Sequence, residues 1–307
     1  MPPRLCAVSV DLDEIPNYYA IHGRAGTQLA GSTAVYDIAV PRLRSLSRAL
    51  DIPLTLFAVG KDLERQESAR AYSEAIRDGH APGNHTLSHL YDLTKRDIGE
   101  IAREIDDGTT AIERACGTRP RGFRAPGYTI TDEVFRVLPG LGYRWDSSVF
   151  PCPTYMAMKD AAIAAYSVLG RPSRSVIDTP AVLTAPTRPY RVGTPYWKRG
   201  NGILELPIQV TRRLRLPYIG TFLMIAGVDR ARWLTKGVVG EPLINLELHG
   251  IDVLDKNDGL DELARSQRDL HVPVSQKEDT LGAIVEMLRA EGYSFVTLDE
   301  AASSVTI

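Results

Sequence analysis

Apolar residues recur with two different periods in the first part of the chain, and the two periods predict strands that alternate with helices. Continuous apolar runs at 5–10 and 54–60 are typical of short buried strands. Between them the apolar residues lie three or four positions apart, which predicts a helix that Pro41 bends. The residues of that period are Tyr36, Val40, Leu43, Leu46 and Leu50. Residues 14–31 are glycine-rich without such a period and are predicted to form a long loop.

The same order of strand, loop and helix continues to residue 148. Thr94 and Asp97 resemble a capping box before one of the helices, and Gly117 follows that helix as a stop signal. Strands separated by helices indicate a parallel sheet and an α/β fold, in which polar residues cluster where the strands end. The further helices are predicted at 67–77, 94–116 and 131–139, and the further strands at 122–127 and 143–148.

The alternation stops between 150 and 240, where Pro, Arg and Tyr are frequent. We interpret this region as elaborated, substrate-specific loops over the C-terminal face of the sheet, with one strand at 203–210. They belong to a single domain that spans 1–307. The alternation returns after this region with a strand at 243–249, a helix at 277–291 and a last strand at 293–298.

Composition and charge narrow the class of protein. The 307 residues are 44% hydrophobic and carry a formal net charge of -2, so the chain lacks the basic footprint of a nucleic-acid-binding protein. The apolar run at 218–228 is shorter than the roughly 20 residues of a membrane span, and no transmembrane segment is expected. The first residues have no signal-peptide pattern, and three widely spaced cysteines are typical of free thiols. We therefore expect a cytoplasmic protein.

A candidate metal site lies at two predicted strand ends. Asp11 and Asp13 flank Leu12, so in an extended chain both carboxylates point the same way. His85 and His89 are four residues apart and would share one face of a helical turn. Asp13, His85 and His89 make three ligands, which leave a coordination position open as in catalytic zinc sites. The alternatives are ordinary core or surface histidines and aspartates that cap turns.

Other strand ends carry residues that metal-assisted hydrolysis requires. Asp11 can act as a base beside a metal-bound water, and Arg124 can pair with it. His249 ends the last long apolar strand and is a candidate acid, which Asp146 could hold with a raised pKa. Taken singly, each of these residues is also explained by a structural hydrogen bond.

The ordered set resembles the polysaccharide deacetylase family, carbohydrate esterase family 4, from residue 5 to about 252. The resemblance implies a distorted (β/α)7-type, TIM-like barrel, with Asp11 as base and Asp13 as metal ligand. It also implies that Arg124 orients the base and that a backbone N–H near Gly127 lines an oxyanion hole. The motifs are Ser9-Val10-Asp11-Leu12-Asp13, His85-Thr86-Leu87-Ser88-His89, Arg124-Ala125-Pro126, Trp145-Asp146 and Leu248-His249.

Two departures from the family pattern bear on the substrate. Gly127 precedes the tyrosine of the Arg-Pro turn, so that Tyr128 is displaced by one position. Glu247 replaces the leucine that the family has two positions before the histidine, and by strand alternation it shares the face of His249. Glu247 therefore argues against an apolar acetyl pocket or for a positively charged substrate. Tyr128 and Trp145 are predicted to contact the substrate.

The sequence therefore predicts a metal-dependent deacetylase that uses metal-bound water to remove the N-acetyl group of an amino sugar or sugar conjugate. Zn²⁺ is the expected ion, with Co²⁺, Ni²⁺ or Fe²⁺ as alternatives. A second hypothesis is hydrolysis of another non-peptide C–N bond, in a formamide, cyclic amide or ureide. A third is a non-catalytic binding module, which would lack a base, an acid or a ligand. The sequence leaves open the oligomeric state, homo-oligomers included, and the roles of His22 and His271.

Overall fold

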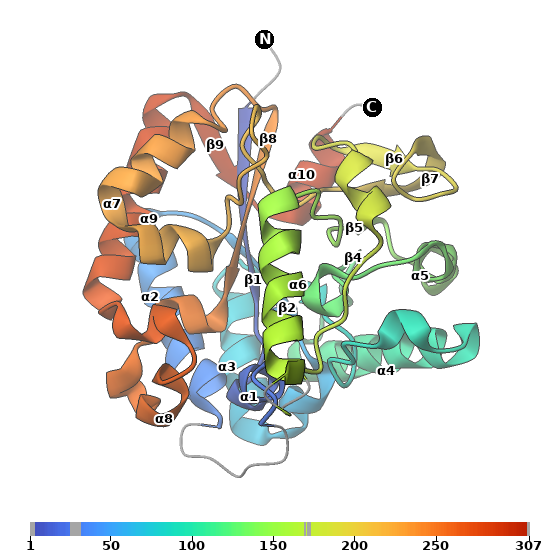
Figure 1. Ribbon diagram of the computed structural model, residues 1–307, viewed down its shortest axis with the longest axis horizontal. Coiled ribbons are helices and arrows are strands. Elements are labelled where there is room, and N and C mark those ends of the chain that lie inside the picture. The colour runs from blue at the N-terminus through green and yellow to red at the C-terminus, as the bar shows by residue number, and fades with distance from the viewer. Residues whose placement is uncertain (1–3, 25–31, 169, 171–172, 306–307) are drawn as a thin grey trace.

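The computed structural model describes residues 4–24, 32–168, 170 and 173–305, which form a curled sheet with helices packed around it (Figure 1). The strand order is β6-β7-β5-β4-β3-β2-β1-β8, and β9 pairs with the first half of β1. The strands are β1 (Arg4–Asp11), β2 (Leu54–Ala58), β3 (Ala81–Asn84), β4 (Gly122–Phe123), β5 (Trp145–Asp146), β6 (Tyr190–Val192), β7 (Arg199–Glu205), β8 (Leu243–His249) and β9 (Tyr293–Val296).

All strand pairs except β6 with β7 are parallel, and the sheet closes on itself through the chain after β7. Leu206 N donates to the Asp146 carbonyl at 2.8 Å, and Gln209 N donates to the Asn245 carbonyl at 3.1 Å. Residues 206–209 therefore connect β5 with β8, the two sides that the strand ladder leaves apart. The predicted α/β class and distorted barrel are confirmed.

The helices are α1 (Ile15–Ile21), α2 (Val40–Leu50), α3 (Gln66–Arg77), α4 (Ile98–Cys116), α5 (Asp132–Val137), α6 (Pro153–Val168), α7 (Gly220–Lys236), α8 (Asp261–Ala264), α9 (Val274–Ala290) and α10 (Leu298–Ser304). The main core joins β1, β2 and β8 to α2, α3, α7 and α9. The cysteines are free thiols, as expected. Among the described helices, none combines the length and apolarity that crossing a membrane requires.

Local chemistry explains where the helices begin. Pro41 lies in the first turn of α2, where its missing N–H costs no hydrogen bond, and a π-helical turn at Val35–Ala39 precedes it. The helix α4 is capped by Asp97, whose side chain accepts from Glu100 N, and the prediction that Thr94 opens it is wrong. The predicted loop at 14–31 is also wrong in part, because Ile15–Ile21 is helical; residues 25–31 lie outside the described part.

The interpretation of 150–240 as loops needs correction, because the region contains α6, the β6–β7 hairpin and α7. The helix α6 buries none of its residues, so it has no apolar stripe for a periodicity search to find. In α7 the left-handed Gly227 (φ 74°) interrupts the regular period. The apolar run at 218–228 forms the start of α7, where Leu223 and Met224 are buried against the core.

Candidate metal centre and active site

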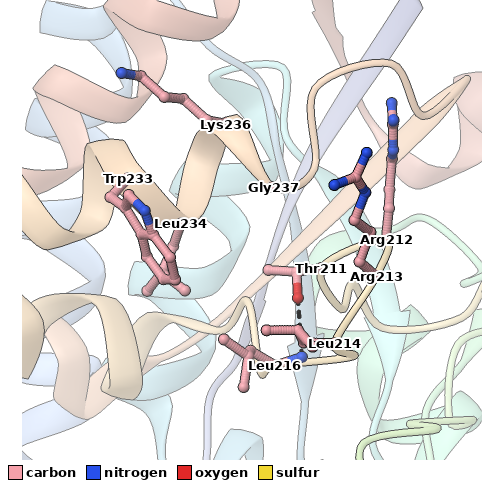
Figure 2. A pocket seen from close by; sticks show the side chains of 9 residues that line it. All are labelled: Thr211, Arg212, Arg213, Leu214, Leu216, Trp233, Leu234, Lys236 and Gly237. Atoms are coloured by element: carbon pink, nitrogen blue, oxygen red, sulfur yellow. Dashed lines mark hydrogen bonds between the residues drawn. The ribbon is translucent and has the colours of Figure 1, made fainter.

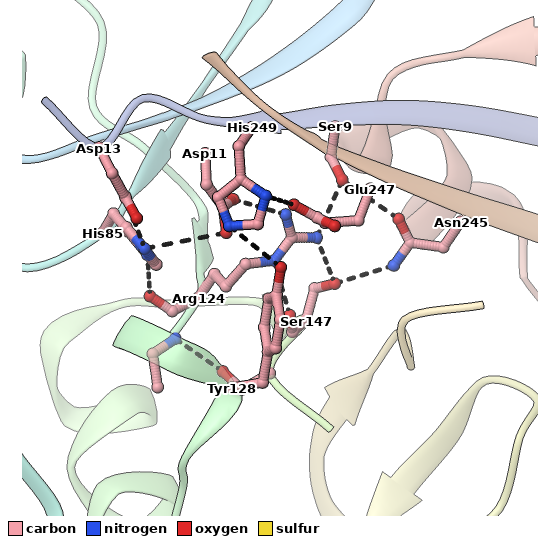
Figure 3. A network of polar contacts seen from close by, with 12 residues as sticks. Ser9, Asp11, Asp13, His85, Arg124, Tyr128, Ser147, Asn245, Glu247 and His249 are labelled. Carbon is pink, nitrogen blue, oxygen red and sulfur yellow. Dashed lines mark hydrogen bonds and ion pairs between the residues drawn. The ribbon is translucent and has the colours of Figure 1, made fainter. Parts of the chain in front are cut away.

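The sheet register brings the predicted site residues to one edge. Asp11 at the end of β1 lies opposite His249 at the end of β8. Two positions after β1, Asp13 meets the histidines that follow β3, with its Oδ1 3.3 Å from His85 Nε2 and its Oδ2 3.2 Å from His89 Nε2. All three side chains are buried, and their candidate ligand atoms lie within 4.8 Å of one another. Figure 3 shows Asp13 and His85 beside Asp11 and His249.

The two histidines do not lie on a helical turn, and that prediction is wrong. They belong to an irregular loop in which Thr86 (φ 68°) and His89 (φ 51°) are left-handed. The Asn84 carboxamide oxygen accepts from Thr86 N at 2.6 Å, and Thr86 Oγ1 accepts from His89 N at 3.0 Å. These local bonds replace the helical ones, and they still direct both imidazoles toward Asp13.

The protonation of His85 suits metal binding. His85 Nδ1 lies 2.7 Å from the Arg124 carbonyl oxygen, which can only accept, so Nδ1 carries the proton and the Nε2 lone pair is left for a ligand. His89 Nε2 and Asp13 Oδ1 are buried without a hydrogen-bond partner. Buried polar atoms normally have partners, and a cation among these three side chains would supply one. Two imidazoles and a carboxylate therefore fit a divalent ion of the zinc type.

Asp11 is held by a buried arginine. Arg124 is fully buried and donates from Nη1 to Asp11 Oδ1 at 2.7 Å, as the sequence predicted. Its Nη2 donates to Ser9 Oγ and Ser147 Oγ, and its Nε donates to the Ser147 carbonyl. Asn245 Nδ2 also donates to Ser147 Oγ. These donors and acceptors fix the guanidinium, and with it the carboxylate of Asp11 (Figure 3).

The sequence reasoning missed Ser9, Ser147 and Asn245. The signal was available for two of them, because Ser9 lies two positions before Asp11 and Asn245 two positions before Glu247. Alternate residues of a strand share a face, so both positions had to face the barrel interior with the charged groups.

His249 is paired with Glu247, and the prediction that Asp146 holds His249 is wrong. His249 Nδ1 lies 3.0 Å from Glu247 Oε1, whereas the Asp146 carboxylate accepts from the Ser148 backbone and hydroxyl. Burial lowers the pKa of His249, but the combined charges of four nearby carboxylates, Glu247 first among them, outweigh it and the net pKa rises to about 9. Burial raises the pKa of Glu247 to about 7. His249 Nε2 faces the site, 3.3 Å from Tyr128 Oη.

Trp145 does not contact the site. Its side chain is 1% exposed, packs on Phe57, and donates from Nε1 to Asp299 Oδ1 at 2.6 Å. Trp145 and Phe57 belong to a core cluster that includes Leu5 at the start of β1, the end opposite to Asp11. The prediction that Trp145 contacts substrate is therefore wrong, because the short strand β5 turns its ring into the barrel.

A cavity of about 260 Å³ opens at the metal residues. Gly127 and Tyr128 line it, as the sequence predicted for the substrate site, whereas Glu247 is not among its lining residues. Glu247, which differs from the family pattern, therefore pairs with His249 and does not face the substrate cavity. The argument that it indicates a positively charged substrate loses its support. Five tyrosines line the cavity: Tyr18, Tyr91, Tyr128, Tyr155 and Tyr166.

A second cavity, of about 360 Å³, lies between residues 211–216 and the end of α7 (Figure 2). Trp233 belongs to this cavity and is 61% exposed. The lining contains no histidine or carboxylate, so the cavity lacks the groups that hydrolysis needs. It is lined by Thr211, Arg212, Arg213, Leu214, Leu216, Trp233, Leu234, Lys236 and Gly237.

Comparison with known proteins agrees with this geometry. Residues 35–145 match the family model of polysaccharide deacetylase. A 104-residue segment is 31% identical to the peptidoglycan-N-acetylglucosamine deacetylase of Bacillus cereus. This segment of the chain is therefore similar to polysaccharide deacetylases. The alignment covers 34% of this chain and 47% of the Bacillus cereus relative, so the chain spans about half of that protein.

Solved structures of the polysaccharide deacetylase fold align with nearly the whole chain. A candidate polysaccharide deacetylase from Mycobacterium smegmatis has a TM-score of 0.53 at 19% identity, over 97% of this chain and 96% of its own. A family 4 acetyl xylan esterase from Clostridium thermocellum, solved with cobalt, has a TM-score of 0.51 at 14% identity, over 98% of this chain and 91% of its own. A CE4 family pseudoenzyme from Bacillus anthracis has a TM-score of 0.52 at 12% identity, over 99% of this chain and 67% of its own. These similarities establish the fold.

Proposed function

We propose that this protein is a metal-dependent deacetylase that hydrolyses the N-acetyl group of an amino sugar or sugar conjugate. One observation carries the proposal: a metal-type triad, an arginine-held carboxylate and a glutamate-held imidazole converge on a single cavity. The polysaccharide deacetylase match and the Bacillus cereus relative support an acetamido sugar as the substrate class.

The triad would hold the cofactor through Asp13, His85 and His89. A divalent ion bound there supplies a Lewis acid that polarises the amide carbonyl and makes water more acidic. We propose Zn²⁺ on the donor set, with Co²⁺, Ni²⁺ and Fe²⁺ as the alternatives to be tested, because imidazole and carboxylate ligands accept all of them.

Asp11 and His249 have complementary tasks in this mechanism. Asp11, ionised beside Arg124, takes a proton from the attacking water. His249, protonated beside Glu247, donates the Nε2 proton to the leaving nitrogen, which would otherwise depart as a poor amide leaving group. Gly127 lies on the cavity wall, and we propose that its backbone N–H binds the oxyanion.

The fold alone does not decide between an enzyme and a binding module, since a structural neighbour from Bacillus anthracis is a pseudoenzyme. The proposal of catalysis therefore depends on the residues of this chain. The residues that we propose as base, acid and metal ligands lie close together, and this arrangement supports the proposal of catalysis.

The decisive experiment combines metal analysis with acetate and formate release from a panel of N-acyl amino sugars. Bound divalent metal and acetate release are expected, and Asp11→Asn should lower kcat by about 10²-fold or more while it keeps the metal. His85→Ala should lose the metal. A purified protein that binds no divalent ion, or an Asp11→Asn variant with full activity, would contradict the proposal. Release of formate alone would favour the second hypothesis, hydrolysis of a formamide.

A further inference from the structure

The helix α6 covers the candidate active site. It runs along the front of the sheet toward α1, and one of its faces forms a wall of the metal cavity (Figure 1). Tyr155 at its start contacts Tyr128, with ring centroids 5.8 Å apart. The cavity is lined from α6 by Tyr155, Met158, Lys159, Ala162, Ile163 and Tyr166.

The position of α6 is not explained by core packing. None of its 16 residues is buried, and Met158 and Val168 are 61% and 88% exposed. Helices in globular proteins gain most of their stability from a buried face, and α6 gains little in this way. Its inner face instead lines the cavity, so α6 contributes more to the walls of the candidate site than to the hydrophobic core.

Two specific contacts fasten α6 over the site. Lys159 Nζ donates to the Gly127 carbonyl at 2.8 Å, which ties the middle of the helix to the proposed oxyanion turn. Near the end of the helix, Tyr166 Oη lies 2.6 Å from His22 Nδ1, and His22 Nε2 lies 2.8 Å from Gln267 Oε1. His22, which the sequence left unassigned, thus links α6 to the end of α1 and to Gln267.

The cavity beneath α6 is small. Its volume of about 260 Å³ is below the roughly 300–1,000 Å³ of pockets that take drug-sized ligands. The tyrosines on its walls offer flat faces and hydroxyls, which suit a single sugar ring. A residue inside a polysaccharide chain would need free passage on two sides, and α6 with its contacts to Gly127 and His22 stands across one of them.

We propose that α6 restricts this site to a small acetamide, a monosaccharide or the terminal sugar of a conjugate, and excludes the interior residues of a polysaccharide. The inference rests on the proposed deacetylase function and adds the substrate class. Tyr166 and His22 act as positioning residues for α6, and Lys159 fixes the helix to the Gly127 turn.

The test measures acetate release by the metal-loaded protein from N-acetylglucosamine and from its linear hexamer. We expect kcat/KM per acetyl group to be at least 10-fold higher for the monosaccharide, with the hexamer deacetylated only at an end residue. Tyr166→Phe and His22→Ala, which loosen α6, should reduce that ratio by raising hexamer turnover. Ala164→Ser, on the exposed face of α6, should leave the ratio unchanged.

Hydrolysis of interior hexamer residues at the monosaccharide rate would overturn the inference and leave the deacetylase proposal standing. If neither sugar releases acetate, the deacetylase proposal fails for these substrates, and binding decides the inference about size. Calorimetry with the Asp11→Asn variant should then show that the hexamer binds no tighter than the monosaccharide. Binding of the hexamer at least 10-fold tighter, or binding of neither sugar, would overturn it.

Discussion

At the scale of single residues, the acid of the proposed reaction depends on one neighbour. Glu247 occupies the strand position two before His249 and lies against its Nδ1. A carboxylate so close stabilises the imidazolium, and together with Asp11, Asp13 and Asp252 it exceeds the opposing cost of burial. His249 is therefore expected to stay protonated, and able to donate, through neutral pH.

The pH profile tests this pair. Activity that needs protonated His249 is lost as the pH rises through a pKa of about 9. Glu247→Gln removes the largest of the charges that raise the pKa and leaves the burial that lowers it, so the alkaline limb of kcat/KM should move down by about 1 unit or more. Glu291→Gln, at an exposed position, serves as the control. An unshifted limb in Glu247→Gln would rule out His249 as the titrating acid.

A second residue-scale prediction concerns Arg124. Arg124→Met leaves Asp11 as a buried charge without its partner, and removal of one member of a buried pair costs about 3–5 kcal/mol. Denaturant unfolding of the metal-free protein measures the loss. The double variant Arg124→Met/Asp11→Asn should recover part of it, because the uncompensated charge is gone. Equal stability of the single and double variants would show that charge pairing is not the cause.

At the scale of elements, the loop after β3 is shaped by α4. Gly108 lies where this helix meets the loop, and a Cβ at that position would come within 2.8 Å of the Thr86 carbonyl carbon and 2.9 Å of Leu87 N. Leu87 N also donates to the Glu104 carbonyl of α4. The helix therefore holds the loop in the conformation that directs both histidines toward Asp13.

Gly108→Ala tests this support. The added methyl group must push the loop backbone away from α4, and overpacking of this kind costs about 1–3 kcal/mol. We expect lower stability and weaker zinc binding, measured by unfolding and by competition with a chelator. Gly282→Ala in α9 is the control, because a Cβ at that position would meet only Leu50 Cδ2, at 3.8 Å. Stability and zinc affinity should stay the same or improve in this variant. Unchanged zinc affinity in Gly108→Ala would show that contact with α4 does not determine the conformation of the loop that carries the two histidines.

At the scale of the whole molecule, the proposed metal joins segments that are distant in sequence. Asp13 follows β1, whereas His85 and His89 follow β3, so an ion on all three links two strands that β2 separates in the sheet. A ligand that binds only the folded state stabilises it by about 4 kcal/mol at 1,000 times its Kd. Removal of the metal is therefore expected to lower the stability of the whole protein and not only of the site.

Thermal unfolding measures this linkage. Treatment with a chelator should lower Tm by several degrees, and excess Zn²⁺ should restore it. His85→Ala should show the same Tm with and without Zn²⁺, because the triad is broken. If the chelator leaves the Tm of the unaltered protein unchanged, the triad contributes no metal linkage to stability.

The predictions from sequence succeeded where local pattern and strand order suffice. Buried apolar runs identified β1, β2 and β8, and the polar residues that follow strands identified Asp11, Asp13, the two histidines and Arg124, because parallel strands end at one edge. They failed where the pattern had no apolar stripe, as in α6, and where hydrogen bonds replaced a helix, as at Thr86.

The sequence by itself determined the fold class and indicated the residues of the candidate site, since these follow from periodicity and from residue types at strand ends. Only the tertiary structure decided which groups pair. In the structure, His249 pairs with Glu247 and not with Asp146. The ring of Trp145 packs in the core, and α6 forms one wall of the cavity. These outcomes depend on distances between segments far apart in the chain, and local pattern carries no information about such distances.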